Sequence, residues 1–389
     1  MQQPYVIVLA SGLNGLGAVR SAAHAELRTY TLLTGQTDLS AYSRFSQYRF
    51  LLPSSPSLDD VRLILDNLYT TESGSGVLIA CSDYAAEILG KLKNEGYSKH
   101  HLMVPGGETT DILNDKKLEC EFMAGGAIPL PRTYFDLADC LPETFPLIIK
   151  PRTFREYQLL GAKNEIVHSR AEFEVFQKRF SGHLNRFIAQ QVIPGNDDNL
   201  WVCNVTFDQN HLMTACFVFK RLGTMPSHYG VTSLAMSLEN QQLRAICEKI
   251  GGILKYTGPA MIEFKRDPTT NRYYYIETNP RLGMCNWFDT RCGVNNLLAS
   301  THAAYGNNIQ VGPQKNNHVY WNFFGDLIAR LENRERLLHI LQLYFGLLKH
   351  RRVGALFYWR DPRPALHYSL ASMKEILYRV SKKLAGNSG

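Results

Sequence analysis

The chain has 389 residues, of which 45% are apolar and 20% charged, and it includes 20 Tyr and 19 Phe. This composition is typical of a globular protein with two or three packed units, and it excludes a disordered chain. No apolar run reaches the roughly 20 residues that a membrane-spanning helix needs. The first residues lack the basic stretch of a secretory signal, so we expect the apolar run at 5–10 to be a buried strand.

The excess positive charge lies at the end of the chain. The net charge is +7, and the segment from His318 onwards holds 12 of the 42 Lys and Arg residues but 5 of the 35 Asp and Glu residues. The rest of the chain is neutral, so we expect no nucleic-acid partner. The eight cysteines form no Cys-x-x-Cys pair, which predicts reduced core thiols, no zinc site and a cytoplasmic protein.

The first hundred residues alternate strand-like and helix-like segments. Apolar runs predict strands at 5–10, 29–34, 77–81 and 101–104, with helices at 15–26, 58–70 and 83–95 between them. Ser82 is the expected N-cap of the third helix. The βαβα rhythm predicts a doubly wound, Rossmann-like α/β domain over residues 1–112.

From about residue 113 the pattern changes to α+β. We predict helices at 115–125, 170–180 and 238–254, and strands at 145–150, 186–193, 200–207, 212–220, 259–266 and 272–278. The last two strands form a hairpin around a turn at 267–271. Beyond residue 315 the chain is predicted to be basic and mostly helical.

The glycine-rich turn after the first strand is a weak signal. Gly12, Gly15 and Gly17 allow a tight turn that points backbone amides at an anion, but their spacing differs from the G-x-G-x-x-G of dinucleotide sites. The second predicted strand also lacks the following acidic residue that would bind a ribose. A purely structural turn explains the glycines at least as well, so a nucleotide-dependent oxidoreductase is only a third hypothesis.

The strongest candidate site lies on the hairpin at 258–281. Glu277 and Asn279 are two residues apart in a strand and therefore share a face. If Glu263 on the paired strand faces them, two carboxylates and one amide oxygen converge, a ligand set that suits Mg²⁺. Arg281, just beyond the strand, is placed to neutralise charge on a phosphoryl group or an acyl phosphate. A solvated hairpin face is the alternative, but it does not explain this polar run at the end of an apolar strand.

Two lysines and a strand exit indicate a nucleotide. Lys150 ends an apolar strand before a proline, so it can present its ammonium to a phosphate, although a solvent-facing strand end is the simpler interpretation when it is considered alone. Lys116 is a second such lysine, at the start of a helix. The stretch 190–193 runs into a Pro-Gly turn, where backbone groups can meet the edge of an adenine.

In this order, these residues resemble the ATP-grasp superfamily. The sequence is most similar to its predicted carboxylate–amine ligases, a group that is also similar to D-aspartate ligases and more remotely to biotin carboxylase. The resemblance covers about residues 5–310 and is most specific at 258–281. It implies a pre-ATP-grasp domain over 1–112, an ATP-grasp domain over 113–315 with a lid at about 113–188, and a helical C-terminal region over 316–389.

The resemblance also implies roles for single residues. Those implied to contact the nucleotide phosphates are Lys116 and Lys150, and those implied to hold one or two Mg²⁺ are Glu263, Glu277 and Asn279. The side chains implied to face the reacting groups are Arg281, Lys220 and Arg221. The implied adenine hinge, where relatives often have an acidic residue, consists of Gln190, Gln191, Val192 and Ile193. The sequence has no glycine-rich flap after the strand lysine, and the candidate phosphate clamps in its place are Arg152, Arg155 and Lys163.

We therefore predict an ATP-dependent ligase that activates a carboxylate as an acyl phosphate and couples it to an amine, with release of ADP and phosphate. The resemblance implies small-molecule substrates, for which an amino acid or a peptide is plausible. A second hypothesis is an ATP-binding regulatory or assembly protein without ligase turnover, but the complete Glu, Asn and Arg set argues against it.

The basic end of the chain has its own prediction. Helical apolar spacing over 327–348 is followed by a basic cluster from Lys349 to Arg352. We expect this region to pack on the catalytic body with a solvated basic end. Peripheral contact with an anionic membrane and contact with an anionic substrate are the alternatives.

Overall fold

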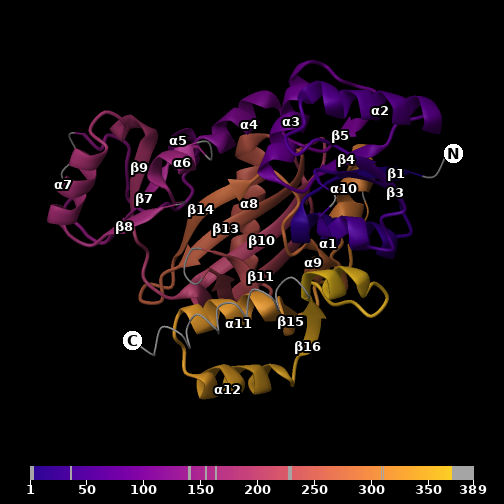
Figure 1. The fold of residues 1–389 in the computed structure, drawn as a ribbon. Coiled ribbons are helices and arrows are strands. Elements are labelled where there is room, and N and C mark those ends of the chain that lie inside the picture. Colours follow the sequence, from indigo (N-terminus) through magenta and orange to yellow (C-terminus); the bar gives the residue numbers. More distant parts are fainter. Residues whose placement is uncertain are drawn as a thin grey trace.

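Three sheets organise the molecule (Figure 1). The structure, a computed structural model, describes residues 4–369 except 36, 139–141, 154–155, 163, 227–229, 308 and 310. A five-stranded sheet forms the first domain, a seven-stranded sheet forms the centre, and a four-stranded sheet forms a separate lid (Figure 1).

The first domain is a parallel sheet in the order β3-β2-β1-β4-β5. Its strands are β1 (Tyr5–Ala10), β2 (Arg28–Leu33), β3 (Tyr48–Leu51), β4 (Val77–Ala80) and β5 (His101–Leu102), and its helices are α1 (Gly12–His24), α2 (Leu58–Glu72) and α3 (Asp83–Asn94). All of β1 is buried because alternate residues face two different cores: Ile7 packs with α2 and α3, and Val8 packs with α1. The Rossmann-like prediction is confirmed, and Ser82 caps α3 by accepting a hydrogen bond from the Ala85 N–H. The unpredicted β3 is an edge strand with no buried residue.

The central sheet has the order β14-β13-β10-β11-β12-β15-β16. Its first five members are β10 (Leu200–Phe207), β11 (Met213–Met225), β12 (Val231–Ser237), β13 (Gly258–Arg266) and β14 (Tyr273–Asn279). Helix α8 (Gln241–Leu254) packs against one face through Leu243 and Cys247. Helices α9 (Asn286–Arg291) and α10 (Asn296–Ala304) cover the other face, where Phe288 packs between Phe217 and Phe219.

The lid sheet has the order β6-β9-β7-β8 and stands apart from the first domain in Figure 1. Its strands are β6 (Thr133–Tyr134), β7 (Leu147–Pro151), β8 (Glu165–Val167) and β9 (Phe187–Gln191), and its helices are α6 (Tyr157–Leu160) and α7 (Arg170–Arg179). Phe173 and Phe176 of α7 give it a small core of its own. Two helices, α4 (Gly107–Asn114) and α5 (Lys116–Gly125), link it to the first domain.

The last elements complete the central sheet. They are β15 (His318–Trp321), α11 (Phe323–Glu332), α12 (Leu337–Leu347) and β16 (Arg351–Gly354). The two strands are four residues long, too short to show a period-2 pattern, so they were not predicted in this region, which was expected to be mostly helical. In the described part of the chain, no helix has the length and apolar character needed to cross a membrane.

A buried ion pair ties the end of the chain to its beginning. The Arg20 Nε of α1 lies 3.0 Å from the Asp361 Oδ2, and both side chains are fully buried. The other guanidinium nitrogens donate to the carbonyl oxygens of Ala355 and Leu356. Asp361 also accepts from the Ser43 hydroxyl, so every polar group in this contact has a partner.

Candidate active site

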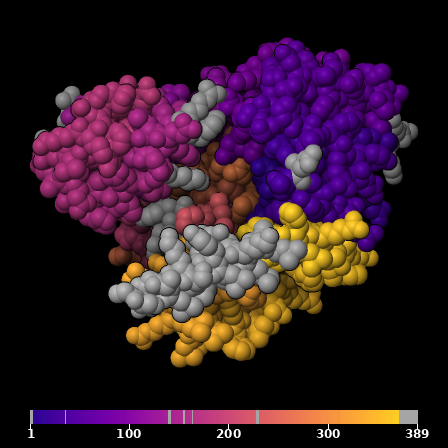
Figure 2. Space-filling view, viewed as in Figure 1, coloured from indigo at the N-terminus to yellow at the C-terminus, as the bar shows by residue number. Residues whose placement is uncertain are grey.

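A cavity of about 320 Å³ lies where the three sheets meet. The space-filling view shows a hollow between the lid and the first domain, with the central sheet at its floor (Figure 2). The predicted site residues that line the cavity are Lys116, Lys150, Gln190, Gln191, Val192, Ile193, Arg221, Glu263, Glu277, Asn279 and Arg281. These eleven side chains come from segments up to 165 residues apart, and the fold collects them in one place.

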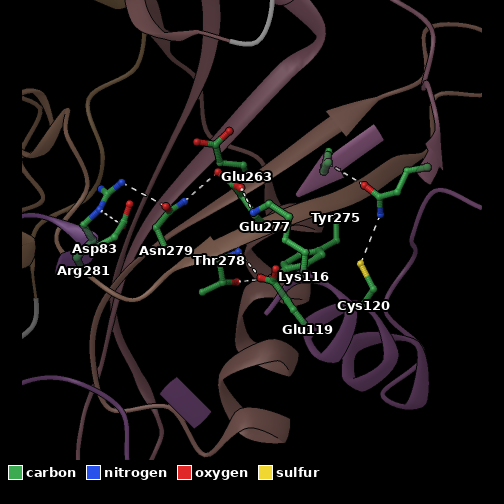
Figure 3. A network of polar contacts seen from close by, with 12 residues as sticks. Asp83, Lys116, Glu119, Cys120, Glu263, Tyr275, Glu277, Thr278, Asn279 and Arg281 are labelled. Atoms are coloured by element: carbon green, nitrogen blue, oxygen red, sulfur yellow. Dashed lines mark hydrogen bonds and ion pairs between the residues drawn. The ribbon is translucent and has the colours of Figure 1, made fainter. Parts of the chain in front are cut away.

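The two predicted metal-binding carboxylates lie directly opposite each other. Glu263 of β13 pairs in register with Glu277 of β14, just before a bulge in the ladder. Asn279 shares the face of Glu277, and its amide donates to the Glu277 Oε1 at 3.3 Å (Figure 3). Two carboxylates and an amide oxygen are hard oxygen donors, so this set fits Mg²⁺. Within the described residues no cluster of three or more His, Cys, Asp or Glu side chains could hold a metal.

Each of these carboxylates has its own cation. The Arg221 Nη2 lies 2.6 Å from the Glu263 Oε1, and both side chains are at most 10% exposed. The Lys116 Nζ lies 3.4 Å from the Glu277 Oε2. Burial lowers the pKa of Lys116, but the charges of Glu277 and Glu119, the nearby Tyr157 and the hydrogen bond to Glu277 together outweigh burial and raise that pKa above its ordinary value. Because desolvated charges need partners, the site holds its anions neutralised before any ligand arrives.

Lys150 faces the cavity from β7. Its ammonium donates to the Gln190 Oε1 at 2.8 Å, a neutral partner. Burial and the nearby charge of Lys116 lower the pKa of Lys150 below its ordinary value. A polyanion between the two lysines would raise that pKa again, so this pair suits the phosphates of a nucleotide.

The hinge at 190–193 uses part of its hydrogen-bonding capacity internally. The Gln190 amide donates to the Thr133 hydroxyl at 3.1 Å, and the backbone N–H groups of Gln191 and Val192 donate to the carbonyl oxygens of Arg132 and Pro146. The Gln190 side chain is therefore turned into the lid sheet. A base bound at this hinge must use the remaining backbone groups.

Arg281 links the central sheet to the first domain. Its Nε lies 2.6 Å from the Asp83 Oδ1 at the start of α3, and its Nη2 donates to the Asn279 Oδ1 at 3.2 Å (Figure 3). The Asp83 side chain is 53% exposed, whereas that of Arg281 is 15% exposed. Asp83 therefore closes one side of the cavity with a carboxylate that solvent can reach.

The chain is similar in sequence to one curated protein and in fold to several solved structures. The chain matches no protein-family model. It is 26% identical over 320 residues to a D-aspartate ligase of Enterococcus faecium (strain Aus0004), a match that covers 74% of each chain. The biotin carboxylase domain of Hydrogenobacter thermophilus 2-oxoglutarate carboxylase, solved with MgADP and bicarbonate, has a similar fold with a TM-score of 0.62 at 14% identity, covering 82% of this chain and 74% of that one. An L-amino acid ligase from Bacillus licheniformis has a TM-score of 0.54 at 14% identity, covering 78% and 75%.

The chain has the ATP-grasp fold. The predicted fold class is thereby confirmed, as is the predicted likeness to D-aspartate ligases and biotin carboxylase. These similarities support ATP-dependent ligation of a carboxylate to an amine. The domain boundaries and the roles of single residues stay predictions.

Two predicted site residues are not among those that line the cavity. Lys220 precedes Arg221 in β11, and neighbouring strand residues point to opposite faces. Its ammonium lies 3.4 Å from the Asp198 Oδ2 instead. Lys163 falls outside the described residues, as does Arg155. Arg152 pairs with Asp115, the N-cap of α5, which also fixes the entry of the helix that carries Lys116.

Glu119 is a cavity residue that was not predicted from the sequence. It is 2% exposed, accepts from the Thr278 N–H at 2.8 Å and contacts the Tyr275 hydroxyl (Figure 3). Burial raises its pKa to about 7, against the opposing charge of Lys116. Its spacing of three residues from Lys116 on one helix was the available signal, because such residues share a helix face. Its partners on β14 lie about 160 residues away in the sequence.

Proposed function

We propose that the chain joins the carboxylate of one small molecule to the amine of another and converts ATP to ADP and phosphate. The observation that carries the proposal is the placement of Glu263 opposite Glu277 in one cavity with Lys150. Carboxylates, cations and a nucleotide hinge without a nucleophile triad suit phosphoryl transfer, which depends mainly on positioning and charge neutralisation.

The reaction has two steps. A carboxylate is a poor electrophile because its leaving group would be oxide, so a carboxylate oxygen first attacks the γ-phosphorus and the bond from that phosphorus to ADP breaks. The amine nitrogen then attacks the carbonyl carbon of the acyl phosphate. The C–O bond to phosphate breaks, and the phosphate takes up the proton that the amine loses. Both steps need a cavity closed to water, since water would hydrolyse the acyl phosphate.

The roles of the residues follow from their positions. Lys116 and Lys150 bind the nucleotide phosphates, and the segment 190–193 binds the base. Arg221 and Arg281 stabilise negative charge on the transferred phosphoryl group. Mg²⁺ would be held by the side chains of Glu263, Glu277 and Asn279. When it is bound, the ion supplies charge neutralisation at the phosphates.

The amine or carboxylate substrate is proposed to be an amino acid. The support is the D-aspartate ligase relative together with the pair of Arg281 and Asp83, because a substrate carboxylate can replace the Asp83 carboxylate on the guanidinium. A cytoplasmic location is part of the same proposal. It is supported by ATP as the substrate and by seven free, buried cysteines in the described part of the chain.

The test is ADP release from Mg-ATP with pooled D- and L-amino acids and dipeptides. We expect release that depends on the substrate pool and is lost in Lys150→Ala and Glu277→Ala. Lys91→Ala, on the surface of α3, serves as the matched control and keeps full turnover. Tight binding of Mg-ATP without release from any pool would contradict the ligase and favour an ATP-binding regulatory protein.

A further inference from the structure

Helix α12 exposes an apolar face. Its five members, here called the α12 apolar face, are Leu337, Leu338, Leu341, Phe345 and Leu348. Phe345 is 69% exposed and Leu338 is 68% exposed. At 100° per residue, the five positions lie within an arc of about 100° on one side of the helix.

The opposite side of α12 is apolar as well, and it packs on the body. Leu347 and Ile340 are buried, and Leu343 and Tyr344 pack against Val319, in the cluster that covers β12 and β15. The Tyr344 hydroxyl donates to the Asp326 Oδ2 of α11 at 2.9 Å, which fixes the helix in this orientation. A helix that is apolar on nearly all sides is normally buried all round, so the α12 apolar face requires a partner.

Basic residues flank the α12 apolar face at both ends. Five exposed cations, here called the α12 basic flanks, are Arg334, Arg336, Lys349, Arg351 and Arg352. None of them pairs with a carboxylate of the described residues. The same stretch holds two acidic residues, Glu332 and Glu335, and Glu335 is paired with Arg330 of α11. The surface around the apolar face is therefore positive.

We propose that α12 docks on an anionic phospholipid surface. The α12 apolar face enters the boundary between headgroups and acyl chains, and the α12 basic flanks contact lipid phosphates. A helix that lies in the membrane interface needs both an apolar face and flanking cations of this kind. A second copy of this chain would satisfy the apolar residues alone. It would not account for five unpaired cations, because a second copy brings the same positive charge to the same place.

The position of α12 in the fold is compatible with catalysis on a membrane. It packs beside β15 at one end of the central sheet, whereas Glu263 and Glu277 lie on β13 and β14 at the other end. In Figure 1 α12 forms the lower rim of the molecule, away from the lid and the first domain. Docking through α12 leaves the cavity open.

The experiment is co-sedimentation of the full chain with phosphatidylcholine vesicles, with and without phosphatidylglycerol, at low and high salt. We expect binding to the phosphatidylglycerol vesicles that weakens as salt rises. Phe345→Glu and Leu338→Glu should each weaken binding by about tenfold or more, and Lys349→Glu and Arg336→Glu each by at least about fivefold.

Matched controls come from other surfaces of the chain. Leu63→Glu on α2 changes a leucine that is 65% exposed, and Lys178→Glu reverses an exposed charge on α7. Both should bind vesicles as the parent does. Circular dichroism and ADP release identify any variant that fails to fold, and ADP release should be unchanged by the α12 substitutions.

Three outcomes would overturn the proposal. One is absence of binding to the anionic vesicles, and another is binding that Phe345→Glu leaves intact. The third is a dimer, seen by light scattering, that Phe345→Glu dissociates while the vesicles are not bound; this would assign the α12 apolar face to a second copy of the chain. None of these results depends on the identity of the ligase substrates.

Discussion

The two ends of the central sheet differ in whether their charged side chains are paired. At the β13–β14 end, the carboxylates of the cavity are matched to nearby cations, as the buried Glu263 is to Arg221. At the β15–β16 end, exposed cations such as Arg352 lie beside exposed apolar side chains such as Phe345. Buried ion pairs contribute little net stability, so the paired charges at the β13–β14 end indicate a ligand site. Exposed charges cost little free energy, so the exposed cations at the β15–β16 end indicate a surface for association. The four predictions that follow test this contrast.

The largest effect is expected at the metal-binding pair. Glu277→Gln keeps the size of the side chain but removes its charge and one of its two hydrogen-bond acceptors. We expect ADP release to fall by about a hundredfold or more because the phosphates lose part of their charge neutralisation. The melting temperature should stay within a few degrees of the parent, since the Glu277 side chain is 32% exposed. Full turnover in this variant would show that the β13–β14 end of the cavity is not part of the catalytic site.

Arg221→Met should destabilise the fold. It leaves Glu263 buried without its cation, and we expect the free energy of unfolding to fall by about 3 kcal/mol. Urea unfolding followed by circular dichroism measures this. The double variant Arg221→Met with Glu263→Gln should recover most of the lost stability but not the ligase activity. If the double variant were no more stable than Arg221→Met, the pair would not be an energetic unit.

Glu119→Gln should flatten the dependence of stability on pH in metal-free buffer. The folded-state pKa of Glu119 is raised to about 7, so the stability that its neutral form contributes is complete below pH 4.5 and is lost as the pH rises through 7. Relative to the variant, the parent should lose up to about 3 kcal/mol between these limits. Thermal melts across this range measure the difference, and the exposed neighbour Glu121 provides the control variant Glu121→Gln.

The smallest effect is expected at the other end of the sheet. Phe345→Glu changes an exposed side chain of α12, so the free energy of unfolding should change by no more than about 0.5 kcal/mol. Urea unfolding in the absence of lipid checks this. A loss of several kcal/mol would mean that Phe345 packs against the fold, and the contrast between the two ends of the sheet would then be wrong.

The sequence predicted features that depend on local pattern. The hairpin carrying Glu263 and Glu277 lies within about 20 residues and has a clear turn at Asp267, so its register could be anticipated. Long apolar runs likewise predicted β1 and β4. Short strands such as β3 and β16 were missed because four residues show no reliable period.

The parts of the site that depend on tertiary packing could not be predicted in the same way. Lys220 was placed in the site with Arg221 because of the resemblance to the ATP-grasp superfamily, yet the alternation of side chains along a strand sends these two residues to opposite faces. Glu119 was missed because its hydrogen-bond donor, the Thr278 N–H, belongs to a different element that is distant in the sequence. Asp83 was anticipated as part of a helix start, but its contact with Arg281 joins two domains that the sequence treats separately.

The contact between Arg20 and Asp361 has a consequence for synthesis of the protein. Domains generally fold in the order in which they leave the ribosome, and the first domain of this chain would be the earliest. Its helix α1, however, buries a guanidinium whose carboxylate is made 341 residues later. The segment that covers this guanidinium, Ala355 to Asp361, is made equally late, so the face of α1 that carries Arg20 stays uncovered until then. We therefore expect the first domain to become fully native only after Asp361 has left the ribosome.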